Sequence, residues 1–237
     1  MKAIILAAGR GSRMRPLSDA RPKPLLEVHG RPLIAWHLEA LARAGMREIV
    51  VNTAWLEEQI VAELGDGSRF GVSIAYSREG RDHGGALETA GGIATALPLL
   101  GDAFWIVSGD VWAPDFEFGA PAASRFVESA RSAQLWLVPN PPFHPNGDFG
   151  LGADGLGIAE GAGPDGQRWT YANIALARAD LFRAITPGTS AKLAPLLYAG
   201  MRERRIGAEV YRGRWENVGT PEQLAALNAA PFFPGSP

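Results

Sequence analysis

The sequence contains no cysteine and only four histidines. The absence of cysteine excludes disulfides, thiolate metal sites and thiol catalysis, and it fits a reducing compartment. The histidines at positions 29, 37, 83 and 144 are scattered, so their spacing does not match a zinc site. His37 falls on the apolar face of an expected helix, and we interpret it as a structural residue.

The chain also lacks an excess of charge of either sign. Lys and Arg total 23 against 25 for Asp and Glu, which gives a net charge of −2. A nucleic-acid coat or a membrane-surface role would normally need a basic excess, so neither partner is expected. No apolar run approaches the roughly 20 residues that span a bilayer. The short apolar run at 3–8 ends in glycine and arginine, which favours a buried strand over a signal peptide.

The composition is otherwise that of an ordinary globular protein. The 237 residues are 46% hydrophobic and 20% charged, which predicts one large folded domain. The first 110 residues alternate short apolar runs with amphipathic segments, as expected for parallel strands joined by right-handed helical crossovers. Strands are expected at 3–8, 49–52, 72–76 and 104–108, and helices between Pro32 and Gly45 and at 55–64 and 91–100.

The second half of the chain is less regular. Strands are expected at 134–138 and 170–177, turn-rich loops at 139–150 and 161–166, and helices at 193–205 and 221–228, followed by a frayed tail at 231–237. The whole pattern predicts a single Rossmann-like α/β domain, with a mostly parallel mixed sheet flanked by helices.

A cationic loop follows the first expected strand, where ligands bind in open parallel sheets. Between positions 10 and 23 five cations face a single acid, Asp19, and these cations are Arg10, Arg13, Arg15, Arg21 and Lys23. Such a loop suits a polyphosphate, because arginine and lysine both bind phosphate oxygens. The glycine spacing matches neither a Rossmann fingerprint nor a P-loop, so a solvated loop with ordinary turn glycines stays open at this point.

Four blocks of sequence together carry a resemblance. They are LAAGRGSR at 6–13 followed by PKP at 22–24, ETAGG at 88–92, SGDVW at 108–112 and WENVGT at 215–220. In this order and spacing they resemble the signature of sugar-1-phosphate nucleotidylyltransferases. The resemblance implies that a sugar 1-phosphate attacks the α-phosphorus of a nucleoside triphosphate, releasing pyrophosphate without a covalent enzyme intermediate.

The resemblance also implies roles for the residues of these blocks. Arg13 would hold the triphosphate and the leaving pyrophosphate, and Lys23 would contact the α-phosphate and the incoming sugar phosphate. Arg10 and Arg15 are weaker candidates for the same work. The nucleotide would lie against Leu6, Ala8, Gly9, Gly11, Ser12, Glu88 and Thr89. A helix-start acid is an equally good interpretation of Glu88.

A magnesium site is implied at Asp110 and Asn217. Mg²⁺ prefers oxygen ligands and commonly takes only one or two from protein. Many relatives carry aspartate at the second position, whereas this chain has Asn217, as in N-acetylglucosamine-1-phosphate uridylyltransferases. We expect Asn217 to be a working ligand with weaker affinity for Mg²⁺. The alternative is that Asn217 only turns the chain before Gly219.

The recognition of the sugar and of the base is less determined by sequence. Sugar contacts are expected from Gly92, Asn140, Asp148, Asn173 and Lys192, for each of which a turn-forming or solvated role stays open. Several relatives use a glutamine upstream of the second block to read a pyrimidine. This chain has RDHGG at 81–85 instead, so the identity of the base stays open.

Within the family, the blocks NTAWL at 52–56, GDGSRFG at 65–71 and KLAPLL at 192–197 resemble N-acetylmuramate 1-phosphate uridylyltransferases of cell-wall recycling. Mannose-1-phosphate guanylyltransferases and glucose-1-phosphate thymidylyl- or uridylyltransferases are the alternatives, and a non-catalytic nucleotide-sugar sensor is a third. We expect a nucleotide-binding half at 1–112, a sugar-binding half at 113–230 and no appended domain. Small-molecule substrates, a cytoplasmic location and a monomer or homodimer are expected.

Overall fold

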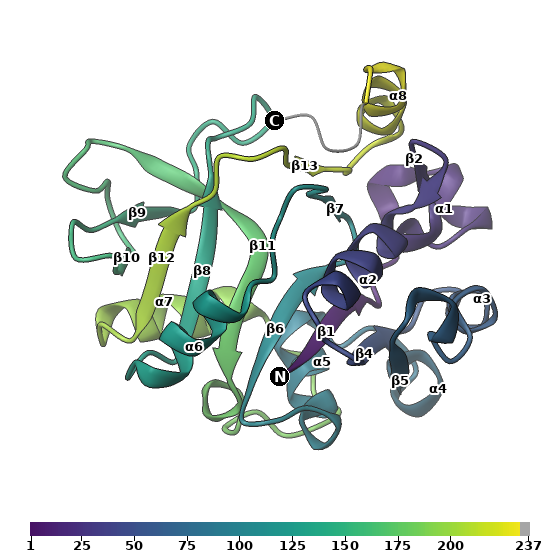
Figure 1. Cartoon of the computed structure of the whole chain (residues 1–237), viewed down its shortest axis with the longest axis horizontal. Helices are drawn as coiled ribbons and strands as arrows, with labels where there is room; N and C mark the ends of the chain where they lie inside the picture. Colours follow the sequence, from purple (N-terminus) through teal and green to yellow (C-terminus); the bar gives the residue numbers. More distant parts are fainter. Residues whose placement is uncertain (233–237) are drawn as a thin grey trace.

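The computed structural model describes residues 1–232 (Figure 1). Most of the tail that the sequence predicts at 231–237 lies outside this range. The helices and turns that the structure shows are α1 (Leu17–Ala20), α2 (Leu33–Arg43), α3 (Glu57–Leu64), α4 (Glu79–His83), α5 (Glu88–Ala96), α6 (Ala120–Glu128), α7 (Leu193–Arg202) and α8 (Pro221–Ala229), with 3-10 turns at Ser12–Met14, Lys23–Leu25, Ser68–Phe70, Leu97–Leu99 and Ala179–Leu181.

The main sheet contains strands from both halves of the chain. The strands of the structure are β1 (Lys2–Ala7), β2 (Glu27–Val28), β3 (Arg31–Pro32), β4 (Glu48–Thr53), β5 (Ser73–Arg78), β6 (Ala103–Ser108), β7 (Val111–Trp112), β8 (Ala133–Val138), β9 (Phe149–Leu151), β10 (Gly157–Ile158), β11 (Arg168–Arg178), β12 (Ile206–Val210) and β13 (Glu216–Asn217). Across its width the order is β5-β4-β1-β6-β11-β8-β12, and only β11 runs against the others. The predicted mostly parallel mixed sheet is therefore confirmed.

The alternation of side chains along β1 explains why this strand is apolar throughout. Ala3 and Ile5 belong to one core cluster, and Ile4 belongs to another on the opposite face. Helices α2 and α3 cover the first face, whereas α5 and α7 cover the second (Figure 1). A strand that is buried on both faces needs a continuous apolar run, which is the pattern visible in the sequence.

Several elements of the second half were not predicted, among them helix α6 and strand β12. Helix α6 is nine residues long, carries a proline in its first turn and buries only Phe126. Strand β12 is a five-residue segment, IGAEV, that pairs in parallel with β8. In addition, the loop predicted at 139–150 ends in β9, which pairs with the start of β11.

A third apolar cluster closes the end of the molecule toward which β6 points (Figure 1). Met14, Trp112, Val218 and Leu224 bring together the loop after β1, strand β7, and the segment from β13 to α8. Phe232 packs against this cluster, and its ring stacks on His29 at a centroid distance of 4.8 Å. This cluster holds the loop after β1 and the β7–β13 ribbon together at the carboxyl ends of the parallel strands. In residues 1–232 no helix is long and apolar enough to cross a membrane.

The buried His37 predicts a specific dependence of stability on pH. Burial lowers the pKa of His37 to about 4, although its hydrogen bond to the Val111 carbonyl and the charge of Asp110 oppose the shift. Between pH 6.5 and 4, His37 is therefore protonated in the unfolded chain and neutral in the folded chain. His37 should contribute a loss of about 3 kcal/mol of unfolding free energy as the pH falls from 6.5 to 4. In urea denaturation, His37→Gln should show a shallower loss over this window, and an identical pH profile would contradict the assignment.

Candidate active site

The loop after β1 folds back on itself beside the sheet. Gly11 has φ of 65°, in the left-handed region that favours glycine, and its carbonyl accepts hydrogen bonds from the Met14 amide and the Ser18 hydroxyl, each at 2.8 Å. A side chain at Gly11 would meet the Cβ of Lys23 at 3.3 Å. The turn at Gly11 therefore allows the two ends of the loop to pack together.

Two of the loop cations lie where a ligand could reach them. Lys23 is only 7% exposed, and its ammonium lies 2.8 Å from Oδ2 of Asp110 at the end of β6. Arg13 lines the cavities on both sides of this contact. Within residues 1–232 its guanidinium has no acidic partner, so it is available to an anionic ligand.

The other three cations of the loop are engaged elsewhere. The guanidinium of Arg10 lies over the ring of Trp55, at 4.3 Å from its centroid, although Arg10 also lines the nucleotide side of the cleft. Arg15 pairs with Asp19 at 3.0 Å, and Arg21 with Glu27 at 3.9 Å, on the exposed side of the loop. Arg10, Arg13 and Lys23 therefore line the cavity, whereas Arg15 and Arg21 pair with acids away from it.

A short antiparallel ribbon brings the two expected metal ligands together. Asn217 pairs with Val111 between β13 and β7, and the Val218 amide donates to the Asp110 carbonyl at 3.0 Å. In the described chain, the Oδ1 atoms of Asp110 and Asn217 are both buried without a hydrogen-bond partner. Buried oxygens normally have partners, so two unsatisfied oxygens on adjoining strands fit a cation between them.

The ionisation of Asp110 is set by two opposing effects. Burial raises its pKa, but the Lys23 ammonium, together with hydrogen bonds from Ser108 and the backbone, holds the pKa below its usual range. Asp110 is therefore ionised at neutral pH, as a metal ligand or a phosphate-site acid must be.

Two cavities adjoin at this point. One, of about 540 Å³, lies over the loop after β1, and we call it the nucleotide cavity. The other, of about 620 Å³, lies between α5, β11 and the start of α7, and we call it the acceptor cavity. Their linings share the residues Leu6, Arg13, Glu88, Thr89 and Ser108. Two ligands could therefore occupy neighbouring spaces and meet beside Arg13.

The structure brings all the predicted nucleotide contacts to one cavity. Leu6, Ala8, Gly9, Gly11, Ser12, Glu88 and Thr89 line the nucleotide cavity together with Arg13, Lys23 and Asp110. Glu88 begins helix α5 with φ of 59°, so the helix starts abruptly at the boundary between the two cavities.

Of the five predicted sugar contacts, three line the acceptor cavity. They are Asp148, Asn173 and Lys192, and Asn217 lines the same cavity. Asn173 has φ of 57° and lies where the pairing of β11 with β8 shifts register. Such a bulge turns a side chain out of the regular alternation of a strand.

The other two predicted sugar contacts lie outside the lining that the described residues form. Asn140 holds its own loop, because its amide donates to the Pro145 and Arg168 carbonyls at 3.1 and 3.0 Å. Gly92 lies inside α5, where an added Cβ would lie 2.4 Å from Oε1 of Glu79. The glycine is needed for this close approach of helix and carboxylate.

Sequence reasoning missed a buried hydrogen-bond chain that joins the walls of the nucleotide cavity. The Ala7 amide donates to Oδ1 of Asn52 at 2.8 Å, and the Asn52 amide donates to Oε1 of Glu79 at 2.6 Å. The Leu87 amide donates to the other Glu79 oxygen at 2.8 Å. Both side chains line the cavity, and Glu79 is 1% exposed. The chain fixes the start of α5 relative to the end of β1.

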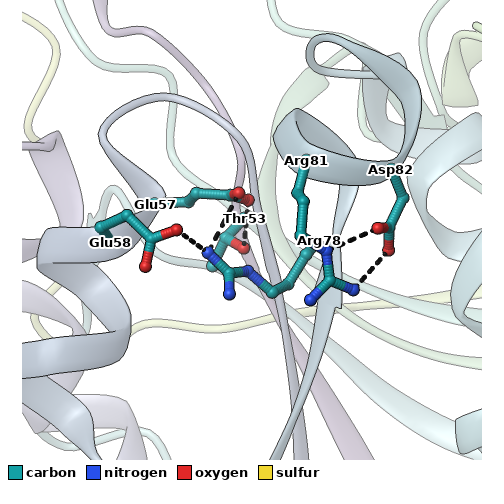
Figure 2. Close-up of polar contacts among 6 residues, drawn as sticks. All are labelled: Thr53, Glu57, Glu58, Arg78, Arg81 and Asp82. Carbon is teal, nitrogen blue, oxygen red and sulfur yellow. Dashed lines mark hydrogen bonds and ion pairs between the residues drawn. The ribbon is translucent and has the colours of Figure 1, made fainter.

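Arg78, the residue before Glu79, is anchored by contacts with α3 (Figure 2). Arg78 donates to Glu57 at 3.2 Å and also contacts Glu58, and Thr53 donates to Glu57 at 3.2 Å. These contacts hold the end of β5 against α3. Glu79 is thereby directed toward the nucleotide cavity as α4 begins.

The segment at 81–85, which stands where several relatives have a glutamine, does not line either cavity among residues 1–232. Arg81 and Asp82 pair with each other on the surface of α4, at 2.6 Å (Figure 2). Ala86, Asn52 and Glu79 line the cavity in this region instead. A polar residue at the carboxyl end of a parallel strand, such as Asn52, is the signal that could have pointed to them.

Comparison with known proteins agrees with this geometry. The nucleotidyl transferase family model matches residues 2–152. The N-acetylmuramate alpha-1-phosphate uridylyltransferase of Neisseria meningitidis serogroup B is 52% identical over 97% of both chains. The chain belongs to the nucleotidyl transferase family. A second such uridylyltransferase of the family, from Caulobacter vibrioides, is 31% identical over 96% of this chain and 95% of its own.

Proteins named for other sugar phosphates also match this chain. The mannose-1-phosphate guanylyltransferase of Mycobacterium tuberculosis is 38% identical over 46% of this chain and 30% of its own. A solved structure, of a putative glucose-1-phosphate thymidylyltransferase from Bacillus anthracis, superposes with a TM-score of 0.79 over 97% of this chain and 94% of its own. At 21% identity this likeness shows the shared fold.

The Asn52–Glu79 chain predicts an effect of Glu79→Gln. One Glu79 oxygen would become an N–H group that faces another N–H group, from either Asn52 or Leu87. A buried unsatisfied donor costs about 1–3 kcal/mol, so thermal stability should decrease. The start of α5 would also lose its fixed position at the nucleotide cavity, so kcat/KM for the nucleotide should fall roughly 10-fold or more. Glu63→Gln, which removes an exposed charge on α3, is the matched control and should change neither. Unchanged nucleotide kinetics in Glu79→Gln would contradict the role of this chain.

Proposed function

We propose that this protein transfers UMP from UTP to N-acetylmuramate 1-phosphate, giving UDP-N-acetylmuramate and pyrophosphate. The observation that carries the reaction is the meeting of two cavities beside Arg13, Lys23 and Asp110. The choice of substrates rests on the relatives that match almost the whole chain, because both are N-acetylmuramate 1-phosphate uridylyltransferases. A nucleoside triphosphate donor favours a cytoplasmic location.

The chemistry needs alignment and charge neutralisation more than proton transfer. A phosphate monoester has its second pKa near 6, so the acceptor is mostly a dianion at neutral pH. It needs no general base. One of its oxygens attacks the α-phosphorus, the new P–O bond forms, and the bond to pyrophosphate breaks. Lys23 is placed to bind the phosphates at the junction, and Arg13 to bind the leaving pyrophosphate.

The pair Asp110 and Asn217 fits a magnesium ion. The two unsatisfied oxygens are a carboxylate and an amide carbonyl, both of which are ligands that Mg²⁺ accepts. When bound, Mg²⁺ supplies positive charge to the phosphate oxygens. The Lys23 ammonium already occupies the other Asp110 oxygen, so Asp110 has one oxygen left for the ion.

The alternatives differ in donor and acceptor and share the chemistry. A mannose-1-phosphate guanylyltransferase or a glucose-1-phosphate thymidylyl- or uridylyltransferase would use the same junction. A nucleotide-sugar sensor would have no need for Arg13, Lys23 and Asp110 as a complete set.

The proposed reaction is tested by a matrix of four nucleoside triphosphates against several sugar 1-phosphates with Mg²⁺, with pyrophosphate release as the readout. UTP with N-acetylmuramate 1-phosphate should be the preferred pair. A strong preference for another pair would overturn the substrate assignment, and no release with any pair would favour the sensor.

Removal of either binding cation should mainly lower turnover. Arg13→Ala and Lys23→Ala each delete charge that opposes the charge developing in the transition state, so kcat should fall roughly 100- to 1,000-fold. Arg15→Ala is the matched control from the same loop, because Arg15 pairs with Asp19 on the exposed side. Initial-rate kinetics test this, and equal losses in all three variants would indicate a general electrostatic effect instead of defined roles.

The ligand role of Asn217 predicts opposite effects of two substitutions. Asn217→Ala removes the oxygen and should raise the Mg²⁺ concentration needed for half-maximal rate, whereas Asn217→Asp adds charge and should lower it. Glu216→Gln changes the exposed neighbour on β13 and should leave the Mg²⁺ titration unchanged. An unaltered titration in Asn217→Ala would reject the ligand role.

A further inference from the structure

The charged residues of the acceptor cavity are few, and most have an evident task. They are Arg13, Glu88, His144, Asp148 and Lys192. Arg13 also lines the nucleotide cavity, where the phosphates meet. Glu88 is an acid and would repel an anionic ligand. Three groups therefore remain to interact with the part of the acceptor that lies away from its phosphate.

Two of these three groups bind each other. The His144 ring lies 3.1 Å from one oxygen of Asp148, and the other oxygen accepts the Tyr171 amide at 2.8 Å. Both oxygens of Asp148 are thus engaged, and His144 is oriented by an acid. This pair forms a satisfied polar wall of the cavity and leaves Lys192 as the remaining cation.

Lys192 is held on a fixed backbone. The preceding residue, Ala191, accepts hydrogen bonds from the Ala90 and Gly91 amides at 2.9 and 3.0 Å and donates its own amide to the Leu87 carbonyl at 3.0 Å. Lys192 then immediately precedes α7, whose Leu193, Ala194 and Leu197 line the same cavity. Lys192 is exposed, and in residues 1–232 it has no acidic partner within ion-pair distance.

Lys192 lines the acceptor cavity, which it shares with Arg13 and Asn217, and does not line the nucleotide cavity. Lys23 and Asp110 line the nucleotide cavity and not the acceptor cavity, whereas the reverse holds for Lys192 among the described residues. A cation so placed is suited to a second negative charge on the acceptor, separate from its phosphate.

We infer that Lys192 is the specificity residue that binds the carboxylate of the acceptor sugar. The inference rests on the proposed function, because N-acetylmuramate differs from N-acetylglucosamine by a lactyl ether that ends in a carboxylate. That carboxylate is ionised at neutral pH and needs a cation when it leaves water. Lys192 supplies the cation. His144 is a poorer site for the carboxylate, because the Asp148 carboxylate lies beside it.

The inference is tested with three acceptors for each enzyme: N-acetylmuramate 1-phosphate, its neutral carboxamide, and N-acetylglucosamine 1-phosphate. The wild-type enzyme should prefer the carboxylate over the carboxamide by roughly 10- to 100-fold in kcat/KM, which is the range for a hydrogen bond to a charged group. Lys192→Met should abolish this preference by lowering the rate with the carboxylate alone. Lys192→Arg should restore much of it, because the positive charge is retained.

A matched control comes from the far end of the same helix. Arg202→Met removes an exposed cation that pairs with Glu160, and it should leave all three acceptors unchanged. Equal loss of carboxylate and carboxamide in Lys192→Met would overturn the inference, since Lys192 would then act on the phosphate or on folding. Absence of any transfer to these acceptors by the wild-type enzyme would instead contradict the proposed function, so the two failures are distinguishable.

Discussion

The contact between the Lys23 ammonium and the Asp110 carboxylate, at 2.8 Å, connects the loop after β1 to the end of β6. The two side chains lie 87 positions apart in sequence, so the fold must bring them together. The Lys23 ammonium favours the ionised form of Asp110, and removal of either side chain would leave an uncompensated charge in a partly buried place. The pair lines the nucleotide cavity, which meets the acceptor cavity at Arg13.

The surrounding structure serves to fix this junction from three directions. The third apolar cluster packs the loop, β7 and the β13–α8 segment into one unit, which places Asn217 beside Val111. The Asn52–Glu79 chain sets the start of α5 relative to β1. The hydrogen bonds of Ala191 tie the start of α7 to the same helix end. Catalysis by alignment needs such rigid support, because small displacements of the reacting groups cost much of the rate.

The parts that sequence could predict are those with a local signal. Strand β1 is predictable because a strand buried on both faces needs a continuous apolar run. The prediction at 3–8 lies one residue after the observed strand at 2–7. Helix α6 buries only Phe126 and has no continuous apolar run. In the site, Arg13, Lys23 and Asp110 came from recognisable motifs. Asn52 and Glu79 could not be paired from sequence, because their hydrogen bond joins distant residues and a lone acid at a helix start looks ordinary.

The central claim is that donor and acceptor phosphates meet at one junction and react in a single displacement. The most direct test is the stereochemical course at the α-phosphorus, measured with a UTP analogue that carries one sulfur at that phosphorus in a single configuration. Direct in-line attack by the sugar phosphate predicts inversion of configuration in the nucleotide sugar. Retention would require two displacements through a covalent enzyme intermediate and would contradict the account.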